Sequence, residues 1–140
     1  NNNYLNPIME NIRKKYICKN QIKKGISGTK EILKFFKKDI SIALMIDQRV
    51  SEGVKCKLFN EDAFTTTIPA QFVKKFDVMV VPIYIERINN NNFKLKISEP
   101  MKFSQNEKIE EITLKLNLFL EKSIVKNPEQ WIWTHNRWKK

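Results

Sequence analysis

Two continuous apolar segments constrain the fold of this 140-residue chain more than any other feature. Residues 40–46 read ISIALMI and residues 78–86 read VMVVPIYIE, and both are rich in β-branched side chains. Neither approaches the roughly 20 apolar residues that cross a bilayer as a helix. Segments of this length and composition are typical of strands that are buried on both faces, as in parallel sheets. They therefore predict two buried strands.

Cap signals and apolar periodicity predict four helices around these strands. The signals include Asn6-Pro7 as a helix start and a Ser104-x-x-Glu107 capping box, and the predicted helices cover about 6–16, 29–38, 67–76 and 104–126. Since helices alternate with buried strands, we predict an α/β fold with a largely parallel sheet flanked by helices. No repeat or long linker interrupts the chain, so residues 1–140 are predicted to form a single domain.

Two further segments alternate apolar and basic residues, which is typical of half-exposed strands. These are residues 54–58, VKCKL, and residues 93–97, FKLKI. The second follows an apolar strand through a polar turn at 89–92 and predicts a hairpin. Lys55 and Lys57 lie on one side of the first strand, where they either form a solvated face or contact an anion.

The net charge of +11 and the isoelectric point of about 9.7 favour anionic partners. Such partners include nucleic acid, anionic membranes, phosphorylated substrates and acidic proteins, and charge alone does not choose among them. Nucleic acid is the disfavoured partner, because the chain has no RNA-recognition or helix-turn-helix signature.

The cysteines and the glycines give no sign of a cofactor. Cys18 and Cys56 lie far apart and lack the spacing of a metal site, so we predict two free thiols, with a disulfide as the alternative. There is no glycine-rich phosphate loop and no G-x-S-x-G motif. We therefore predict neither a metal nor a cofactor.

Asp47, Gln48 and Arg49 follow the first apolar segment directly. Ligands of parallel α/β sheets bind at the carboxyl ends of the strands, so these residues are candidates for a binding site. The alternative is a solvated loop in which Asp47 caps a turn.

The C-terminal tail, PEQWIWTHNRWKK, holds all three tryptophans and the only histidine, His135. His135 could act as a base, join an aromatic and cationic platform for nucleic acid, or take part in packing. No carboxylate accompanies it at helical spacing. Packing and hydrogen bonding are therefore the favoured roles.

Several segments, taken in order, resemble the lipid A biosynthesis acyltransferase family of lauroyl and myristoyl transferases. They are NNNYLNPIMENIRKKY, LMIDQRVSEGVKCKLFNEDAFTTT, VVPIYIER, FKLKISEP and PEQWIWTHNRWK. The resemblance implies a glycerolipid acyltransferase-like fold. It also implies transfer of a fatty acyl chain from acyl carrier protein to a hydroxyl of a Kdo-lipid A precursor, at the cytoplasmic face of the bacterial inner membrane. Both partners, and an anionic membrane surface, would suit the basic charge.

The resemblance further implies substrate-binding roles for Asp47, Gln48, Arg49 and Pro82. These residues correspond to the third and fourth motifs of the wider superfamily and would line the acyl and acceptor groove. The third motif reads Asp-Gln here, whereas glycerol-phosphate acyltransferases typically have Glu-Gly.

One motif of the resembled family is missing. The family's base is the histidine of H-x4-D/E, but the residue four positions after His135 is Lys139. We therefore expect the chain to be the C-terminal part of an acyltransferase domain, incomplete at its N-terminus, with no catalytic residue and no activity by itself. The base, an arginine motif and a membrane anchor would lie upstream. His135 and Arg137 then become polar anchors of a tail that packs through its tryptophans. The alternative function is a non-catalytic basic module that binds anionic lipid or nucleic acid.

Overall fold

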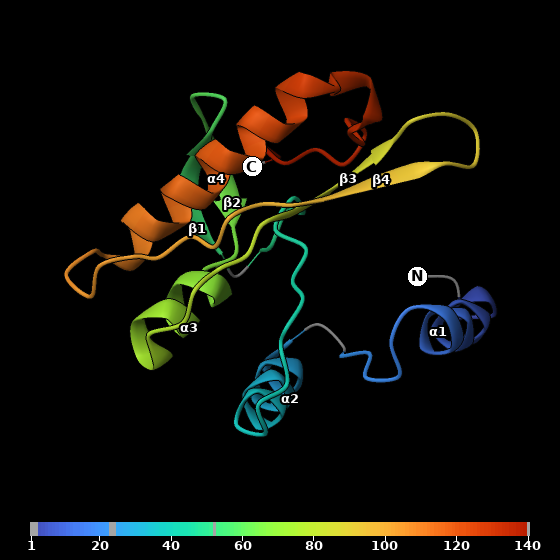
Figure 1. Ribbon diagram of the computed structural model, residues 1–140, viewed down its shortest axis with the longest axis horizontal. Helices are drawn as coiled ribbons and strands as arrows, with labels where there is room; N and C mark the ends of the chain where they lie inside the picture. The colour runs from blue at the N-terminus through green and yellow to red at the C-terminus, as the bar shows by residue number, and fades with distance from the viewer. Residues whose placement is uncertain (1–2, 23–24, 52, 140) are drawn as a thin grey trace. The chain divides into compact units, whose positions relative to one another are not determined.

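The structure is a computed structural model that describes residues 3–22, 25–51 and 53–139 (Figure 1). By compactness the chain divides into residues 1–43 and residues 44–140, which are described separately below. The prediction of one domain over 1–140 stays a prediction.

The first unit contains two of the predicted helices, α1 (Leu5–Tyr16) and α2 (Ile26–Phe36). Helix α1 matches its prediction closely, and α2 begins three residues earlier than the sequence indicates. The predicted apolar side of α1, formed by Ile8, Met9 and Ile12, is exposed, and no residue of α1 is buried.

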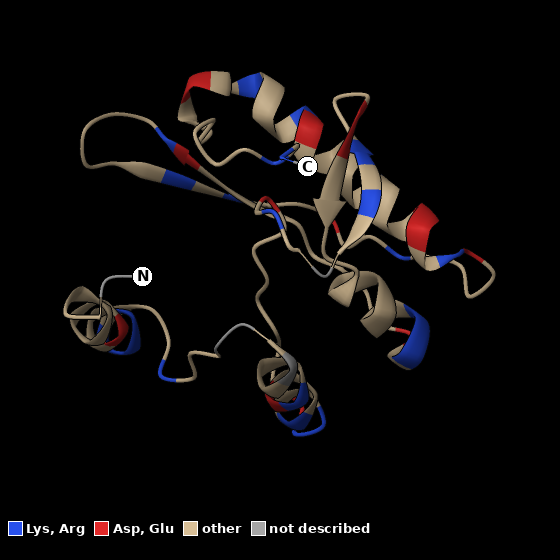
Figure 2. Cartoon of the chain, turned by 180° about the vertical axis from the view of Figure 1, so that it is seen from behind, with Lys and Arg blue, Asp and Glu red and all other residues tan. Residues whose placement is uncertain are grey.

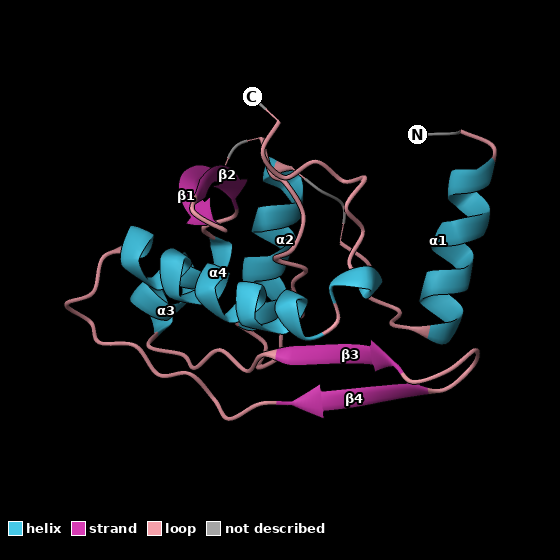
Figure 3. Ribbon diagram, turned by 90° about the horizontal axis from the view of Figure 1, so that it is seen from above, coloured by secondary structure: helices cyan, strands magenta, loops and turns pink. Residues whose placement is uncertain are grey.

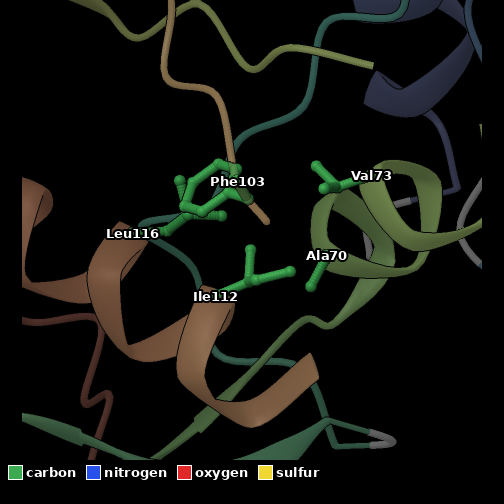
Figure 4. Packing of buried hydrophobic residues seen from close by; sticks show 5 residues of the cluster. All are labelled: Ala70, Val73, Phe103, Ile112 and Leu116. Atoms are coloured by element: carbon green, nitrogen blue, oxygen red, sulfur yellow. The ribbon is translucent and has the colours of Figure 1, made fainter. Parts of the chain in front are cut away.

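The second unit has its core between α3 (Ile68–Phe76) and α4 (Ile109–Lys126). Five side chains from these helices and from the segment before α4 point toward one another (Figure 4), namely Ala70, Val73, Phe103, Ile112 and Leu116. Each is at most 5% exposed. Removal of this apolar surface from water holds α3 against α4.

A tight hairpin of β1 (Val54–Leu58) and β2 (Glu61–Thr65) also packs against α4. Its two-residue loop, Phe59 and Asn60, has positive φ angles of 53° and 63°. Asparagine tolerates this conformation, but phenylalanine rarely adopts it. The carboxylate of Glu121 on α4 stabilises the loop, because it accepts a hydrogen bond from the Phe59 N–H at 2.6 Å.

The predicted hairpin of β3 (Ile83–Arg87) and β4 (Phe93–Ile97) is confirmed (Figure 3). In the antiparallel register Ile83 pairs with Ile97, and Ile85 pairs with Leu95. All four side chains are more than half exposed. One face of this hairpin is therefore apolar and open.

The predicted α/β fold with a largely parallel sheet is wrong. In the described residues the strands form two separate antiparallel sheets of two strands each. Residues 40–46 have no regular secondary structure, and within residues 78–86 only Val80 bridges Met101 before β3 begins. An apolar run shows that a segment can be buried, but a parallel sheet also needs neighbouring strands to bond to. The described residues supply no such neighbours, because β1 pairs only with β2, and β3 only with β4.

The boundaries of the last helix are partly as predicted. Asn127 and Pro128 end α4, and Pro128 opens a short 3-10 helix, η1 (Pro128–Gln130). The helix N-cap, however, is Lys108, whose backbone N–H donates to the Glu111 carboxylate at 2.8 Å. Ser104 and Glu107 form a turn before the helix, in which the Glu107 carboxylate accepts the Ser104 N–H at 2.8 Å.

Both cysteines are free thiols, as predicted, with Cys18 exposed and Cys56 buried in β1. Burial raises the pKa of the Cys56 thiol. In the described part of the chain, no helix has the length and apolar character needed to cross a membrane.

Candidate functional site

The segment that contains Asp47, Gln48 and Arg49 lies against the β1–β2 hairpin and the C-terminal tail. The Val50 N–H donates to the Phe64 carbonyl of β2 at 3.4 Å. From the tail, Arg137 donates through Nη1 to the Gln48 carbonyl, and the Arg49 N–H donates to His135 Nε2 at 3.0 Å. The backbone of the predicted site is thus bonded from both sides.

The side chain of Arg49 is held in place by several contacts. Its Nε donates to the Lys139 carbonyl at 3.2 Å, and its Nη1 donates to Ser51 Oγ at 3.1 Å. The guanidinium lies 5.3 Å from the centre of the Phe64 ring, and Lys55 Nζ lies 5.9 Å from the same ring. Two cations therefore contact one aromatic ring.

Arg137 is the largest fully buried side chain of the described residues and is 0% exposed. Besides the Gln48 carbonyl it bonds the Phe64 carbonyl at 2.9 Å through Nη1, and Thr65 Oγ1 at 3.1 Å through Nη2. Burial lowers the pKa of Arg137, and the negative charge of Asp47 acts in the opposite direction. The negative charge of Asp47 therefore offsets part of the cost of burying this cation.

The Thr65 hydroxyl joins this arginine to α4. It donates to the Ala63 carbonyl at 3.1 Å, and it accepts from Arg137 Nη2 and from Asn117 Nδ2 at 3.2 Å. One donor and two acceptor positions are the full capacity of a hydroxyl group. Asn117 Nδ2 also donates to the Lys57 carbonyl at 2.9 Å. This polar network was not predicted, since no spacing in the sequence relates residues 65, 117 and 137.

Of the three tryptophans that were predicted to pack the tail onto the body, Trp138 bonds to the β1–β2 hairpin, whereas Trp133 is 51% exposed and bonds within the C-terminal segment. Trp138 Nε1 donates to the Leu58 carbonyl of β1 at 3.0 Å, and Trp133 Nε1 donates to the Pro128 carbonyl at 2.7 Å. Trp131 meets both rings edge-on, with centroids 4.7 Å from Trp133 and 5.9 Å from Trp138. The predicted roles of His135 and Arg137 as polar anchors are also confirmed by their hydrogen bonds.

Pro82, the fourth predicted site residue, lies in a different environment. It is buried just before β3, and its carbonyl accepts the Ser98 N–H at 2.9 Å, which extends the β3–β4 hairpin. A shallow hollow near the other end of this hairpin is lined by Ile85, Arg87, Phe93, Glu129 and Gln130. The predicted site residues do not line it.

Lys57 belongs to a solvated ion pair. Its Nζ lies 2.7 Å from a carboxylate oxygen of Asp62, which faces it across the hairpin, and both side chains are more than half exposed. The hydrogen bond between them raises the pKa of Lys57 and lowers that of Asp62. Of the two lysines on this strand, Lys55 is therefore the one near the Phe64 ring, which Arg49 also contacts.

The geometry of His135 does not suit a general base. Its Nε2, the nitrogen that would accept a proton, already accepts the Arg49 N–H, so the proton of the neutral ring lies on Nδ1. Within residues 3–22, 25–51 and 53–139, no three His, Cys, Asp or Glu side chains form a group that could hold a metal ion.

Comparison with known protein families assigns the class. The model of the bacterial lipid A biosynthesis acyltransferase family matches residues 1–140, which is the whole chain. The chain belongs to this family, and the resemblance seen in the sequence is confirmed. The family catalyses acyl transfer in lipid A biosynthesis, with an acyl donor and a lipid A acceptor. A search of curated proteins found no match.

Proposed function

We propose that this chain forms part of an enzyme that transfers a fatty acyl chain from acyl carrier protein to a hydroxyl of a Kdo-lipid A precursor. The observation that supports the proposal is the family match over all 140 residues. The proposed location is the cytoplasmic face of the bacterial inner membrane, where both substrates are accessible.

The reaction is an attack of the acceptor hydroxyl on the thioester carbonyl of the donor. A carbon–oxygen bond forms, the carbon–sulfur bond breaks, and the hydroxyl proton passes through a general base to the thiol that leaves. Positioned hydrogen-bond donors stabilise the oxyanion of the intermediate. The only histidine of the chain is His135, whose acceptor nitrogen is occupied, so we propose that the base is supplied from outside these 140 residues.

In this proposal Asp47, Gln48 and Arg49 border the groove for the acyl chain and the acceptor, and Pro82 shapes a neighbouring part of it. Arg49 and Lys55 would meet the negative charge of a phosphorylated acceptor. Lysine and arginine residues also occur on every helix from α1 to α4 and on β1, β3 and β4 (Figure 2). Near an anionic membrane such residues contribute roughly 1 kcal/mol each.

An acyl transfer assay with acyl carrier protein as the donor tests the proposal. The complete gene product is expected to turn over, and the isolated 140-residue chain is expected to be inactive. Robust turnover by the isolated chain would show that a base lies within it.

Asp47→Asn in the complete gene product tests the site. We expect activity to fall about tenfold or more, as for loss of a group that orients substrate. Since Asp47 also acts on the buried Arg137, the urea midpoint of the variant must be measured alongside. Asp62→Asn is the matched control, because it removes the same charge from an exposed pair on the hairpin. Equal activity of the two variants would assign Asp47 a structural role only.

A second candidate, a non-catalytic basic module, is favoured by the charge of +11. An inactive complete gene product that binds anionic vesicles in a salt-dependent manner would support it. Tighter binding to oligonucleotides than to such vesicles would instead indicate nucleic acid as the ligand.

A further inference from the structure

The segment around Gln48 and Arg49 has no regular secondary structure, and the β1–β2 hairpin and the tail hold it from outside. Residues 40–46 before it are irregular, and its bond to the hairpin is the long one from the Val50 N–H, 3.4 Å from the Phe64 carbonyl. The bonds to Gln48 and to Arg49 N–H come from the tail. The conformation of the segment therefore depends on residues almost ninety positions away.

The two tail residues act on consecutive peptide groups. Arg137 donates to the Gln48 carbonyl, and His135 accepts the N–H of the next residue, Arg49. His135 and Arg137 lie two residues apart in a turned part of the tail, where the His135 N–H donates to the Ile132 carbonyl at 3.1 Å. One tail segment thus binds an acceptor and a donor of the loop at the same time, which fixes both position and orientation.

Substitution of Arg137 and substitution of His135 should affect the rest of the fold to different degrees. Arg137 is fully buried and also bonds β2, so its loss would disturb the hairpin as well as the loop. His135 is exposed, and its ring fills no core position. Substitution of His135 therefore removes one bond to the loop and leaves the rest of the fold in place.

We propose that His135 and Arg137 are positioning residues, which set the backbone of Gln48 and Arg49 for substrate binding. The part of the inference that concerns activity rests on the proposed function. The part that concerns the loop does not, and the two parts can be tested separately.

The first test measures amide hydrogen exchange at Arg49 by NMR in the 140-residue chain. His135→Phe keeps a ring but has no acceptor, and we expect the protection of the Arg49 amide to fall about tenfold, the scale of one hydrogen bond. His135→Gln places an amide oxygen near the former Nε2 and should restore most of the protection. Thr134→Ala is the control, since it alters the neighbouring exposed residue and should change nothing.

Unchanged protection of Arg49 in His135→Phe would overturn the inference. So would a general loss of protection across β1 and β2 to the same degree, since His135 would then support the whole unit rather than the loop.

The second test measures steady-state kinetics of the complete gene product. His135→Phe is expected to raise the KM for the acceptor several-fold with a smaller change in kcat, and His135→Gln to restore it. Loss of Arg49 protection without a change in KM would refute the positioning role. In that case the activity of Asp47→Asn tests the proposed binding site independently. If Asp47→Asn lowers activity and His135→Phe does not, the binding site stands and only the positioning role of His135 is refuted.

Discussion

At the scale of single residues, Thr65 has the most demanding role. Its hydroxyl uses its full hydrogen-bonding capacity inside the protein, and it connects a β-strand, a helix and the tail through Ala63, Asn117 and Arg137. Two other atoms of this network, Asn117 Oδ1 and Arg137 Nε, are buried without a hydrogen-bond partner, so the loss of a further acceptor would be costly. Thr65 lies next to Phe64, whose ring and carbonyl both contact the candidate site.

Thr65→Val should destabilise the chain by about 1–3 kcal/mol, because buried donors of Asn117 and Arg137 lose an acceptor. Thr65→Ser keeps the hydroxyl and loses one buried methyl, which should cost about 1 kcal/mol. Urea unfolding followed by circular dichroism measures both. A valine variant at least as stable as the serine variant would show that the hydroxyl contributes little.

At the scale of elements, the two hairpins have different supports. The β1–β2 hairpin is held by α4 and the tail, whereas one face of the β3–β4 hairpin is open. The closed face of β3–β4 is polar, with Glu86 paired to Lys96 and bonded by Asn127 Nδ2 at 3.1 Å. These partners lower the pKa of Glu86 below its ordinary value of 4.5, with Lys96 as the larger cause. Asn127 at the end of α4 therefore connects this hairpin to the helix.

The lowered pKa of Glu86 predicts how stability depends on pH. A carboxyl group with a depressed pKa in the folded state stabilises the fold above its unfolded value, and the stabilisation is lost as pH falls through the folded value. Urea midpoints should therefore decrease below about pH 4.5, and Glu86→Gln should make this decrease shallower. Part of the decrease should remain in this variant, because Glu107 also has a lowered pKa, chiefly through Lys115. The control is Glu99→Gln in the exposed segment after β4, and an equally shallow slope in that control would refute the assignment.

At the scale of the whole molecule, exposed apolar surface accompanies a strongly basic charge. The open face of β3–β4 carries Ile83, Ile85, Phe93, Leu95 and Ile97, each at least 57% exposed. Monomeric soluble proteins seldom leave such a contiguous apolar face in water. The net charge of +11 opposes self-association, whereas the exposed apolar face of the β3–β4 hairpin favours it.

Ile85→Thr together with Leu95→Thr should reduce this exposed apolar surface without loss of strand propensity. We expect the fluorescence of a bound hydrophobic dye such as ANS to fall about twofold, and solubility at high salt to rise. The control is Lys94→Thr. Lys94 lies opposite Glu86 in the strand register, so its side chain is on the other face of the hairpin. Equal dye binding by the double variant and the parent chain would mean that the dye binds elsewhere.

The sequence by itself determined the local features of this protein and its family. The helix limits near Tyr16, Phe76 and Lys126 and the β3–β4 hairpin follow from caps, turns and periodicity, which act over a few residues. The family assignment follows from short sequence motifs, such as the C-terminal PEQWIWTHNRWK, which are recognised without knowledge of the fold. Tertiary structure alone decided the rest. It left residues 40–46 outside any sheet, paired β1 with β2 through an unusual Phe59-Asn60 turn, and brought Thr65, Asn117 and Arg137 together. The physical reason is that an apolar run encodes a preference for burial but not its partner, and that hydrogen bonds between distant residues leave no periodic trace in the sequence.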